Sequence, residues 1–246
     1  MPRAQRKQWT VYRAQPYNRS RGPLMMDAYN DFAEDLVRKR PKSTQPEADY
    51  LFSIRLVGSK KPTIMRILLI PSTFTFEQFN DVIQIAFGWT NYHGHYFTVS
   101  MLPKEDEGFF FGVERDERNE KDWTLADFYD GEVYPDGVDV SYTYDMGDWW
   151  DHSIDFLGRA DPNLRRTAGI PSGVKVACLG GEGHPGAEDC GGAAGWENLK
   201  ACFKKRSDPY DRKDWYKNEC MNGEESLDPW KWSKDEVNAK LSEFEW

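Results

Sequence analysis

The sequence contains few of the residues that cross-link a protein or anchor it in a membrane. Only four of its 246 residues are cysteines, and no two of them form a CxxC pair, so nothing indicates a disulfide scaffold or a standard zinc finger. The longest apolar run, residues 64–71, is short and interrupted by Arg66, which excludes a membrane-spanning helix there. The N-terminal segment lacks the apolar stretch of a secretory signal. We therefore expect an intracellular, cytoplasmic protein with free thiols and no membrane partner.

Positive charge is also scarce and unevenly placed. The formal net charge of -9 argues against a surface that follows the phosphates of a long nucleic acid. Residues 1–26, however, hold six Lys or Arg and no acid, so this segment is either a solvated terminus or an arm that contacts RNA. An aminoacyl-tRNA partner would depend on this arm and on the basic runs at 38–42 and 204–206.

Hydrophobic patterning predicts a main domain preceded by a basic extension. Residues 1–44 are expected to form the extension, with one helix over residues 24–40. Apolar and polar side chains then alternate as in strands, first over 50–57 and next over 63–70, and these two segments are expected to be neighbours in one sheet. The charge run at 114–122 is interpreted as a solvated loop.

The strongest helix signal comes after these strands. Thr75 and Gln78 have the spacing of a capping box, and an apolar stripe runs along residues 76–87. The chain from 45 to 246 is therefore predicted to be a single α+β domain, with a mixed or antiparallel sheet and packed helices. Two closing helices are expected over residues 196–206 and 233–246.

The segment VDVSYTYDMGDWWDHSIDF, residues 138–156, is predicted to form a β-hairpin. Alternating side chains run along both arms, and the MGD sequence between them is typical of a turn. Asp145 and Asp148 would then flank the turn. His152 would lie on the apolar face, and Asp151 would point to the opposite face.

Seven glycines occur between Gly180 and Gly195. This is too many for a regular element, so a tightly folded loop is expected there. Its acids, Glu182, Glu188 and Asp189, would repel a phosphate and suit a cation, whether a metal, an amine or a guanidinium. A purely structural role as a buried turn is the alternative.

Four unlike motifs occur in one order, at residues 51–71, 75–97, 142–156 and 178–192. Together they resemble the plasmid pRiA4b ORF-3-like family of α+β proteins. The resemblance also implies a relation to fungal cyclodipeptide synthases, which join arginine to a second amino acid by using aminoacyl-tRNAs. That group is described by a paired-aspartate motif with a glutamate three residues on. This chain has no adjacent Asp pair, and its nearest match is GDWWDH.

Aminoacyl transfer requires a base for the attacking amine, a group that stabilises the oxyanion, and an acidic pocket for a cationic side chain. His152 or His93 is the candidate base, oriented by Asp148 or Asp151. Each histidine also has a structural interpretation, His152 as a core residue of the sheet and His93 as part of a turn.

The substrate would be a small compound derived from amino acids. Glu188 and Asp189, with Glu182, are the candidates for receiving a cationic side chain, and Trp149 and Tyr144 are candidate aromatic contacts.

Two other functions stay open from the sequence. One is a non-catalytic module that binds a peptide or a cation, and the other is a metal-dependent hydrolase built on the same histidines and acids. The spacing Cys-x5-His-x5-Cys is not a standard zinc pattern, so no metal or cofactor is expected. The residues of that disfavoured metal site are His93, His95, His184, Cys178 and Cys190.

Overall fold

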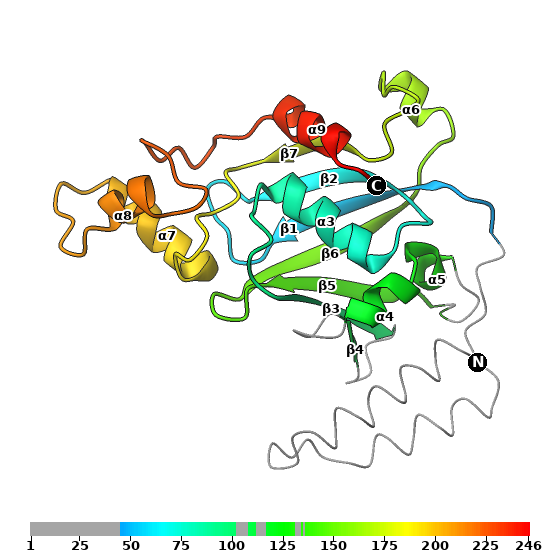
Figure 1. The fold of residues 1–246 in the computed structure, drawn as a ribbon, viewed down its shortest axis with the longest axis horizontal. Coiled ribbons are helices and arrows are strands. Elements are labelled where there is room, and N and C mark those ends of the chain that lie inside the picture. Colours follow the sequence, from blue (N-terminus) through cyan, green and yellow to red (C-terminus); the bar gives the residue numbers. More distant parts are fainter. Residues whose placement is uncertain (1–44, 102–107, 112–116, 131–133, 135) are drawn as a thin grey trace, which may run out of the picture.

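The computed structural model describes residues 45–101, 108–111, 117–130, 134 and 136–246 (Figure 1). The predicted basic extension and its helix lie outside the described residues. The strands are β1 (Asp49–Leu56), β2 (Met65–Pro71), β3 (His95–Met101), β4 (Gly108–Phe111), β5 (Val138–Tyr144), β6 (Trp150–Arg159) and β7 (Ala177–Glu182). The helices are α3 (Phe76–Phe87), α4 (Glu117–Asp122), α5 (Leu125–Tyr129), α6 (Leu164–Thr167), α7 (Gly192–Phe203), α8 (Arg212–Asn218) and α9 (Lys234–Glu243). Of the described helices, none combines the length and apolar character that a membrane crossing requires.

The described strands form one seven-stranded sheet in the order β4-β3-β5-β6-β1-β2-β7. All of its pairings are antiparallel. β1 and β2 are neighbours as predicted, with Phe52 opposite Leu68. β5 and β6 form the predicted hairpin, with Tyr142 opposite His152. The predicted α+β class, with an antiparallel sheet and packed helices, is therefore confirmed.

Helix α3 lies across one face of the sheet and closes the core (Figure 1). It begins at the predicted capping box, in which Thr75 and Gln78 each accept a hydrogen bond from the other's backbone N–H. Its apolar stripe is buried, and Phe79 stacks on Phe97 of β3 with ring centroids 5.5 Å apart. Burying one such ring contributes about 2–3 kcal/mol. Gly88 ends the helix at φ 70°, because a left-handed residue there favours glycine.

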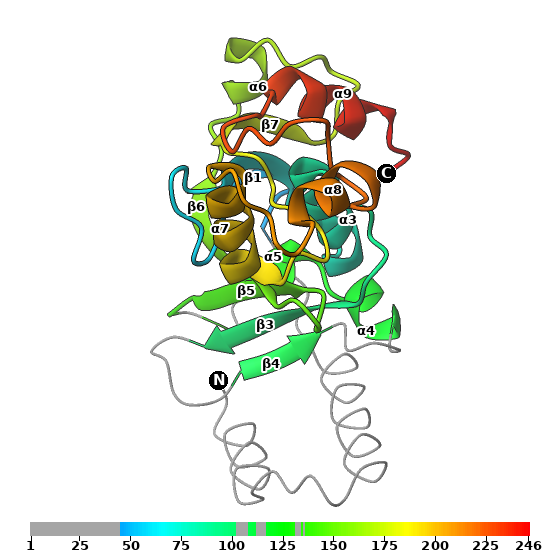
Figure 2. The same cartoon turned by 90° about the vertical axis from the view of Figure 1, so that its left-hand side faces the viewer.

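Helix α9 covers the edge of the sheet at β7, and Figures 1 and 2 both show the two elements side by side. The side chain of Asn238 bonds both backbone groups of Cys178, accepting from its N–H at 2.7 Å and donating to its carbonyl at 2.9 Å. The Asn238 side chain thus satisfies backbone groups of β7 that a further strand would otherwise pair with at this edge. Ser233 caps α9 by accepting the N–H of Glu236, at the start of the closing helix predicted from residue 233.

Two stretches fold differently from their predictions. β7 continues through Gly180 and Gly181, whereas their glycine content predicts a loop. Close packing explains the difference, since a Cβ on Gly181 would lie 2.6 Å from the carbonyl oxygen of Met65. The charge run at 114–122 predicts a loop, yet its last six residues form α4. The reason is tertiary, because Glu120 of α4 is buried against the sheet.

Candidate functional site

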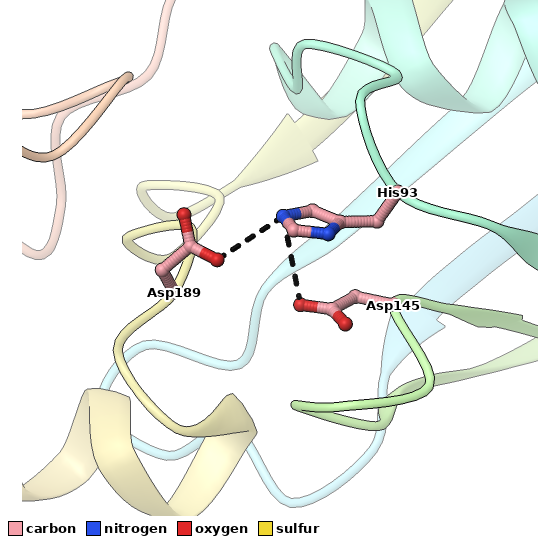
Figure 3. Close-up of side chains that lie close together, drawn as sticks. All are labelled: His93, Asp145 and Asp189. Carbon is pink, nitrogen blue, oxygen red and sulfur yellow. Dashed lines mark ion pairs between the residues drawn. The ribbon is translucent and has the colours of Figure 1, made fainter.

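Three ligand-type side chains from separate loops meet at one end of the sheet (Figure 3). His93 lies between α3 and β3, Asp145 directly follows β5, and Asp189 lies between β7 and α7. The Nε2 atom of His93 is 3.1 Å from Oδ1 of Asp189 and 3.9 Å from Oδ2 of Asp145. One ligand atom of each residue lies within 4.8 Å of the other two. We call these three residues the His93 cluster.

The His93 cluster is closed on one side and open on the other. The side chain of Asp145 is 9% exposed, whereas that of Asp189 is 53% exposed, with His93 between them at 26%. In the part of the chain that the structure describes, no lysine or arginine forms an ion pair with either aspartate. The cluster therefore opens to solvent on the Asp189 side, and no described lysine or arginine neutralises its two carboxylates.

The loops that carry the cluster are conformationally strained. Asn91, Asp145, Trp149 and Asp189 are non-glycine residues with φ between 55° and 63°. Such values are uncommon outside glycine, and for a bulky side chain such as Trp149 they are clear outliers. Backbone strain persists where the surrounding structure imposes it, and it gathers at functional sites. Two of these four residues are themselves members of the cluster.

Glu188 holds the same loops together from the buried side. Its Oε1 accepts hydrogen bonds from the hydroxyl of Tyr144 at 2.7 Å and from the backbone N–H and hydroxyl of Thr90 at 3.2 and 3.0 Å. The Tyr144 oxygen in turn accepts from the N–H of Tyr92. Burial raises the pKa of Tyr144 well above its ordinary value, so the phenol stays a donor at neutral pH. Glu188 and Tyr144, both predicted to contact substrate, are fully buried here.

Asp148 joins the hairpin turn to the glycine loop. Its Oδ2 accepts the backbone N–H of Gly191 at 2.8 Å. The two segments approach so closely that a Cβ on Gly192 would lie 2.1 Å from the Asp148 carbonyl oxygen. The contact of Asp148, a predicted orienting acid, is therefore with backbone, and it fixes the loop of Asp189 against the turn of Asp145.

His152 lies in the core of the sheet. It is completely buried, and neither ring nitrogen has a hydrogen-bond partner among the described residues. Its ring packs edge-on against Phe87 and Trp89, at 4.8 and 5.0 Å between centroids. Burial lowers the pKa of His152 to about 3. The structure thus favours its structural interpretation, and it brings neither Asp148 nor Asp151 to the imidazole.

The other predicted contacts lie apart from the cluster. Asp151 is exposed on the opposite face from His152, where it accepts from the hydroxyl of Thr143 at 2.7 Å. Trp149 is 54% exposed, with its ring edge-on to Tyr96. Glu182 ends β7, paired in register with β2. Of the acids predicted in the glycine loop, only Asp189 reaches the cluster.

The remaining histidines and cysteines do not assemble a metal site in the described residues. The Nε2 of His95 lies 3.1 Å from Oε2 of Glu120, in a separate pair. Burial lowers the pKa of His184 to about 4. Burial also raises the pKa of both the Cys178 and the Cys190 thiols, the latter to about 12, so neither is a thiolate at neutral pH.

Asp145 is the member of the cluster that sequence reasoning missed. The available signal was its position directly after a tyrosine-rich strand, at the entrance to a turn. Its Oδ1 accepts the N–H of Gly147 at 2.8 Å, a common role for an aspartate in a turn. The Oδ2 atom of Asp145 lies opposite His93. Which loop is placed there depends on the order of strands in the sheet, so the sequence alone does not show this contact.

Fold and site together define an α+β protein with a histidine and two aspartates at the end of one antiparallel sheet. The family model for the plasmid pRiA4b ORF-3-like protein matches residues 48–239, and the chain belongs to that family. It is 28% identical over 139 residues to the uncharacterized protein y4hQ of Sinorhizobium fredii, a match that covers 56% of this chain and 65% of that one. The chain thus spans just under two thirds of that relative.

The fold is also similar to a solved structure. A crystal structure of a protein of unknown function from Methanosarcina mazei Go1 matches with a TM-score of 0.60 at 24% identity. The match covers 78% of this chain and 99% of the other. At this level of identity the likeness concerns the fold alone.

Proposed function

We propose that the protein is a metal-dependent hydrolase whose divalent cation is held by His93, Asp145 and Asp189. The observation that carries this proposal is the spacing of the ligand atoms. Two ligands of one ion, each about 2.1 Å from it, are separated by roughly 3 Å. The Nε2 to Oδ1 distance of 3.1 Å between His93 and Asp189 matches this separation, and Asp145 at 3.9 Å requires only a small side-chain adjustment.

Charge supports the same proposal. Two carboxylates this close repel each other, and either a bound metal ion or the protonated imidazole of His93 would offset that repulsion. A neutral imidazole and two carboxylates are a donor set suited to Zn²⁺, Mn²⁺ or Fe²⁺, and no thiolate is present to select a softer ion. The cation would balance the two negative charges that the described lysines and arginines leave unpaired.

The open side of the cluster would supply the chemistry. Three protein ligands leave coordination positions for water and substrate, which is the pattern of catalytic rather than structural sites. A bound divalent ion polarises an acyl or phosphoryl oxygen and makes its bound water a nucleophile near neutral pH. Asp189, which is half exposed, lies on the side from which substrate would enter.

Metal titration tests the proposal. The full-length protein is stripped with EDTA, dialysed and titrated with Zn²⁺ and Mn²⁺ by calorimetry, and hydrolysis of p-nitrophenyl acetate and p-nitrophenyl phosphate is measured with and without metal. We expect one saturable site in the wild type. Asp145→Asn is the sharpest variant, because its retained Oδ1 still accepts from Gly147; we expect it, like Asp189→Asn, to weaken metal binding by roughly 100-fold or more.

The matched control is His95→Ala. His95 also pairs with a carboxylate at 3.1 Å, that of Glu120, but the described residues offer it no third ligand. Its loss should leave metal affinity within about twofold of the wild type. A stripped protein that takes up neither ion, or an Asp145→Asn protein that binds like the wild type, would contradict the proposal.

A second candidate is the aminoacyl transferase implied by the family resemblance, a cyclodipeptide synthase that joins arginine to a second amino acid. The favouring observation is that no described lysine or arginine pairs with Asp189 or Asp145, so a substrate ammonium or guanidinium would satisfy the same two carboxylates. His93, oriented by Asp189 at 3.1 Å, would then be the base.

Product analysis separates the two functions. Extracts of bacteria that express wild type or His93→Ala are compared by mass spectrometry. Arginine-containing cyclic dipeptides made only by the wild type would support the transferase. Their absence from cells that contain folded protein, together with metal uptake by the purified chain, would favour the hydrolase.

A further inference from the structure

A cavity of about 360 Å³ lies on the α9 side of the sheet. Its walls come from the end of α3, the segments 221–224 and 231–233, and the α9 residues Glu236, Val237 and Lys240, and Thr90 forms part of one side. No residue of the His93 cluster lines it. Its volume is in the range of sites that hold metabolite-sized molecules, about 300–1,000 Å³.

Arg66 of β2 forms one wall of this cavity and is only 1% exposed. Four of its five N–H groups donate to backbone carbonyls: Nε to Ala86, Nη1 to both Met65 and Glu182, and Nη2 to Gly183. The Ala86 carbonyl belongs to the last turn of α3, where a cation is favoured by the helix dipole. These bonds fix the position of the guanidinium, but they supply no full negative charge.

The charges around the cavity do not balance. In the described chain Arg66 forms no ion pair with a carboxylate. Two acids line the cavity, and both act on Lys231, Glu224 through a 2.6 Å ion pair and Glu236 at longer range. Lys240 is a third cation on the wall. Burial lowers the pKa of Arg66 to about 9, so it remains charged at neutral pH and its charge stays uncompensated.

Two buried donors at the cavity have no acceptor in the described residues. One is the second N–H on Nη2 of Arg66, and the other is the Nε1–H of Trp232. The rings of Trp232 and Phe87 lie 5.1 and 5.0 Å from the guanidinium carbon. A buried donor without an acceptor costs about 1–3 kcal/mol. A ligand that brings acceptor oxygens would recover this cost and supply the missing negative charge.

We propose that this cavity binds a small organic anion, whose carboxylate or phosphate group accepts hydrogen bonds from Arg66 and Trp232. Lys240, which is exposed, adds positive charge at the rim. The apolar part of the ligand would contact Phe87 and Met221, which also line the cavity. The anion site is separate from the His93 cluster and does not depend on the function proposed for it.

Calorimetry of the full-length protein with inorganic phosphate and with benzoate, at constant ionic strength, tests the proposal. We expect saturable binding of at least one probe, and the preferred probe identifies the anionic group of the ligand. Trp232→Phe keeps a ring over Arg66 but removes the Nε1 donor, so it should weaken binding about tenfold. No saturable binding of either probe, or unchanged affinity in Trp232→Phe, would overturn the proposal.

Two lysines of α9 provide the matched comparison. Lys240 lines the cavity and Lys234 does not, although both are exposed. Lys240→Ala is expected to weaken binding about threefold, and Lys234→Ala should leave it unchanged. Equal weakening by both variants would show non-specific attraction and would also overturn the proposal. Asp189→Asn should bind the probes like the wild type, which keeps this test independent of the metal site.

Discussion

His93 and His152 lie on either side of one aromatic layer. Trp89 stacks on Tyr144 at 4.8 Å and contacts His152 at 5.0 Å, while His93 packs on Tyr144 at 5.8 Å. His93 is partly exposed and faces two carboxylates. His152 is fully buried, and neither of its ring nitrogens has a hydrogen-bond partner in the described part of the chain. Two histidines from the same family motifs therefore have opposite surroundings.

This difference shows what decides whether a histidine is available for chemistry. Solvent access and a charged partner keep a histidine able to bind a metal or move a proton. Burial among aromatic rings disfavours the protonated form and leaves no room for a ligand. A motif rich in ionisable residues does not distinguish an accessible histidine from a buried one. A motif is a continuous stretch of sequence, whereas a site is formed by side chains from loops that are far apart in the chain.

The largest expected effect on this comparison of His93 with His152 is a loss of stability. It follows from the close contact between Gly192 and Asp148, beside the His93 cluster. Gly192 has φ 65°, and a Cβ there would lie 2.1 Å from the Asp148 carbonyl oxygen. Gly192→Ala should lower the free energy of unfolding by about 3 kcal/mol, and it should weaken the proposed metal binding by separating Asp189 from Asp145. Urea unfolding and metal titration measure the two effects.

Gly173→Ala is the control for that substitution, because nothing lies within 4 Å of the Cβ it would add. Its stability should remain close to that of the wild type. If Gly192→Ala unfolded at the same urea concentration as Gly173→Ala, the two loops would not be held together as the structure describes.

The second expected effect is a pH dependence of the free energy of unfolding that comes from the buried His152. The pKa of His152 is lowered to about 3 by burial, so between that pH and about 6.5, the pKa of an unfolded histidine, protons bind the unfolded chain more than the folded one. The contribution of His152 to the free energy of unfolding is therefore fully present above about pH 6.5 and is lost as pH falls. From pH 7.5 to pH 5 the loss should be about 2 kcal/mol.

His152→Phe checks this assignment. Phenylalanine keeps the aromatic packing and cannot be protonated, so the variant should lose about 2 kcal/mol less than the wild type between those two pH values. Urea unfolding at both pH values gives the comparison. Part of the pH dependence should persist, because burial also lowers the pKa of His184, to about 4. An identical pH dependence in the variant and the wild type would place His152 outside the core.

The smallest effects separate the two aspartates of the GDWWDH segment. Asp148→Ala removes the exposed bond from the Gly191 N–H and should cost about 0.5–1 kcal/mol. Asp151→Ala removes the partly buried bond that the Thr143 hydroxyl donates, on a side chain that is itself buried, and should cost about 1–2 kcal/mol. Chemical unfolding and metal titration measure both variants. If Asp148→Ala lost all hydrolysis of the p-nitrophenyl substrates at unchanged stability, that carboxylate would instead be assigned to catalysis.

The sequence predicted most of the helices and strands that surround the site, but it did not predict the site itself. The capping box at Thr75, the hairpin and the inward direction of His152 follow from local spacing, and all three are present. His93 and Asp189 were both candidates, yet no local pattern paired them. Asp145 was recognised only as a turn residue. Helix α8 carried too weak an apolar pattern to be predicted, since Tyr216 is the one buried residue among its seven.

The sequence by itself determined the α+β class, the family motifs and the face on which each hairpin side chain lies, because alternation and capping are properties of neighbouring residues. Only the tertiary structure decided that His93, Asp145 and Asp189 meet. Their contact requires β3 and β5 to be adjacent, Asp148 to hold the glycine loop, and Glu188 to fix the loop at Thr90. Contacts between loops far apart in the chain depend on sheet order and buried hydrogen bonds, and no local periodicity encodes either.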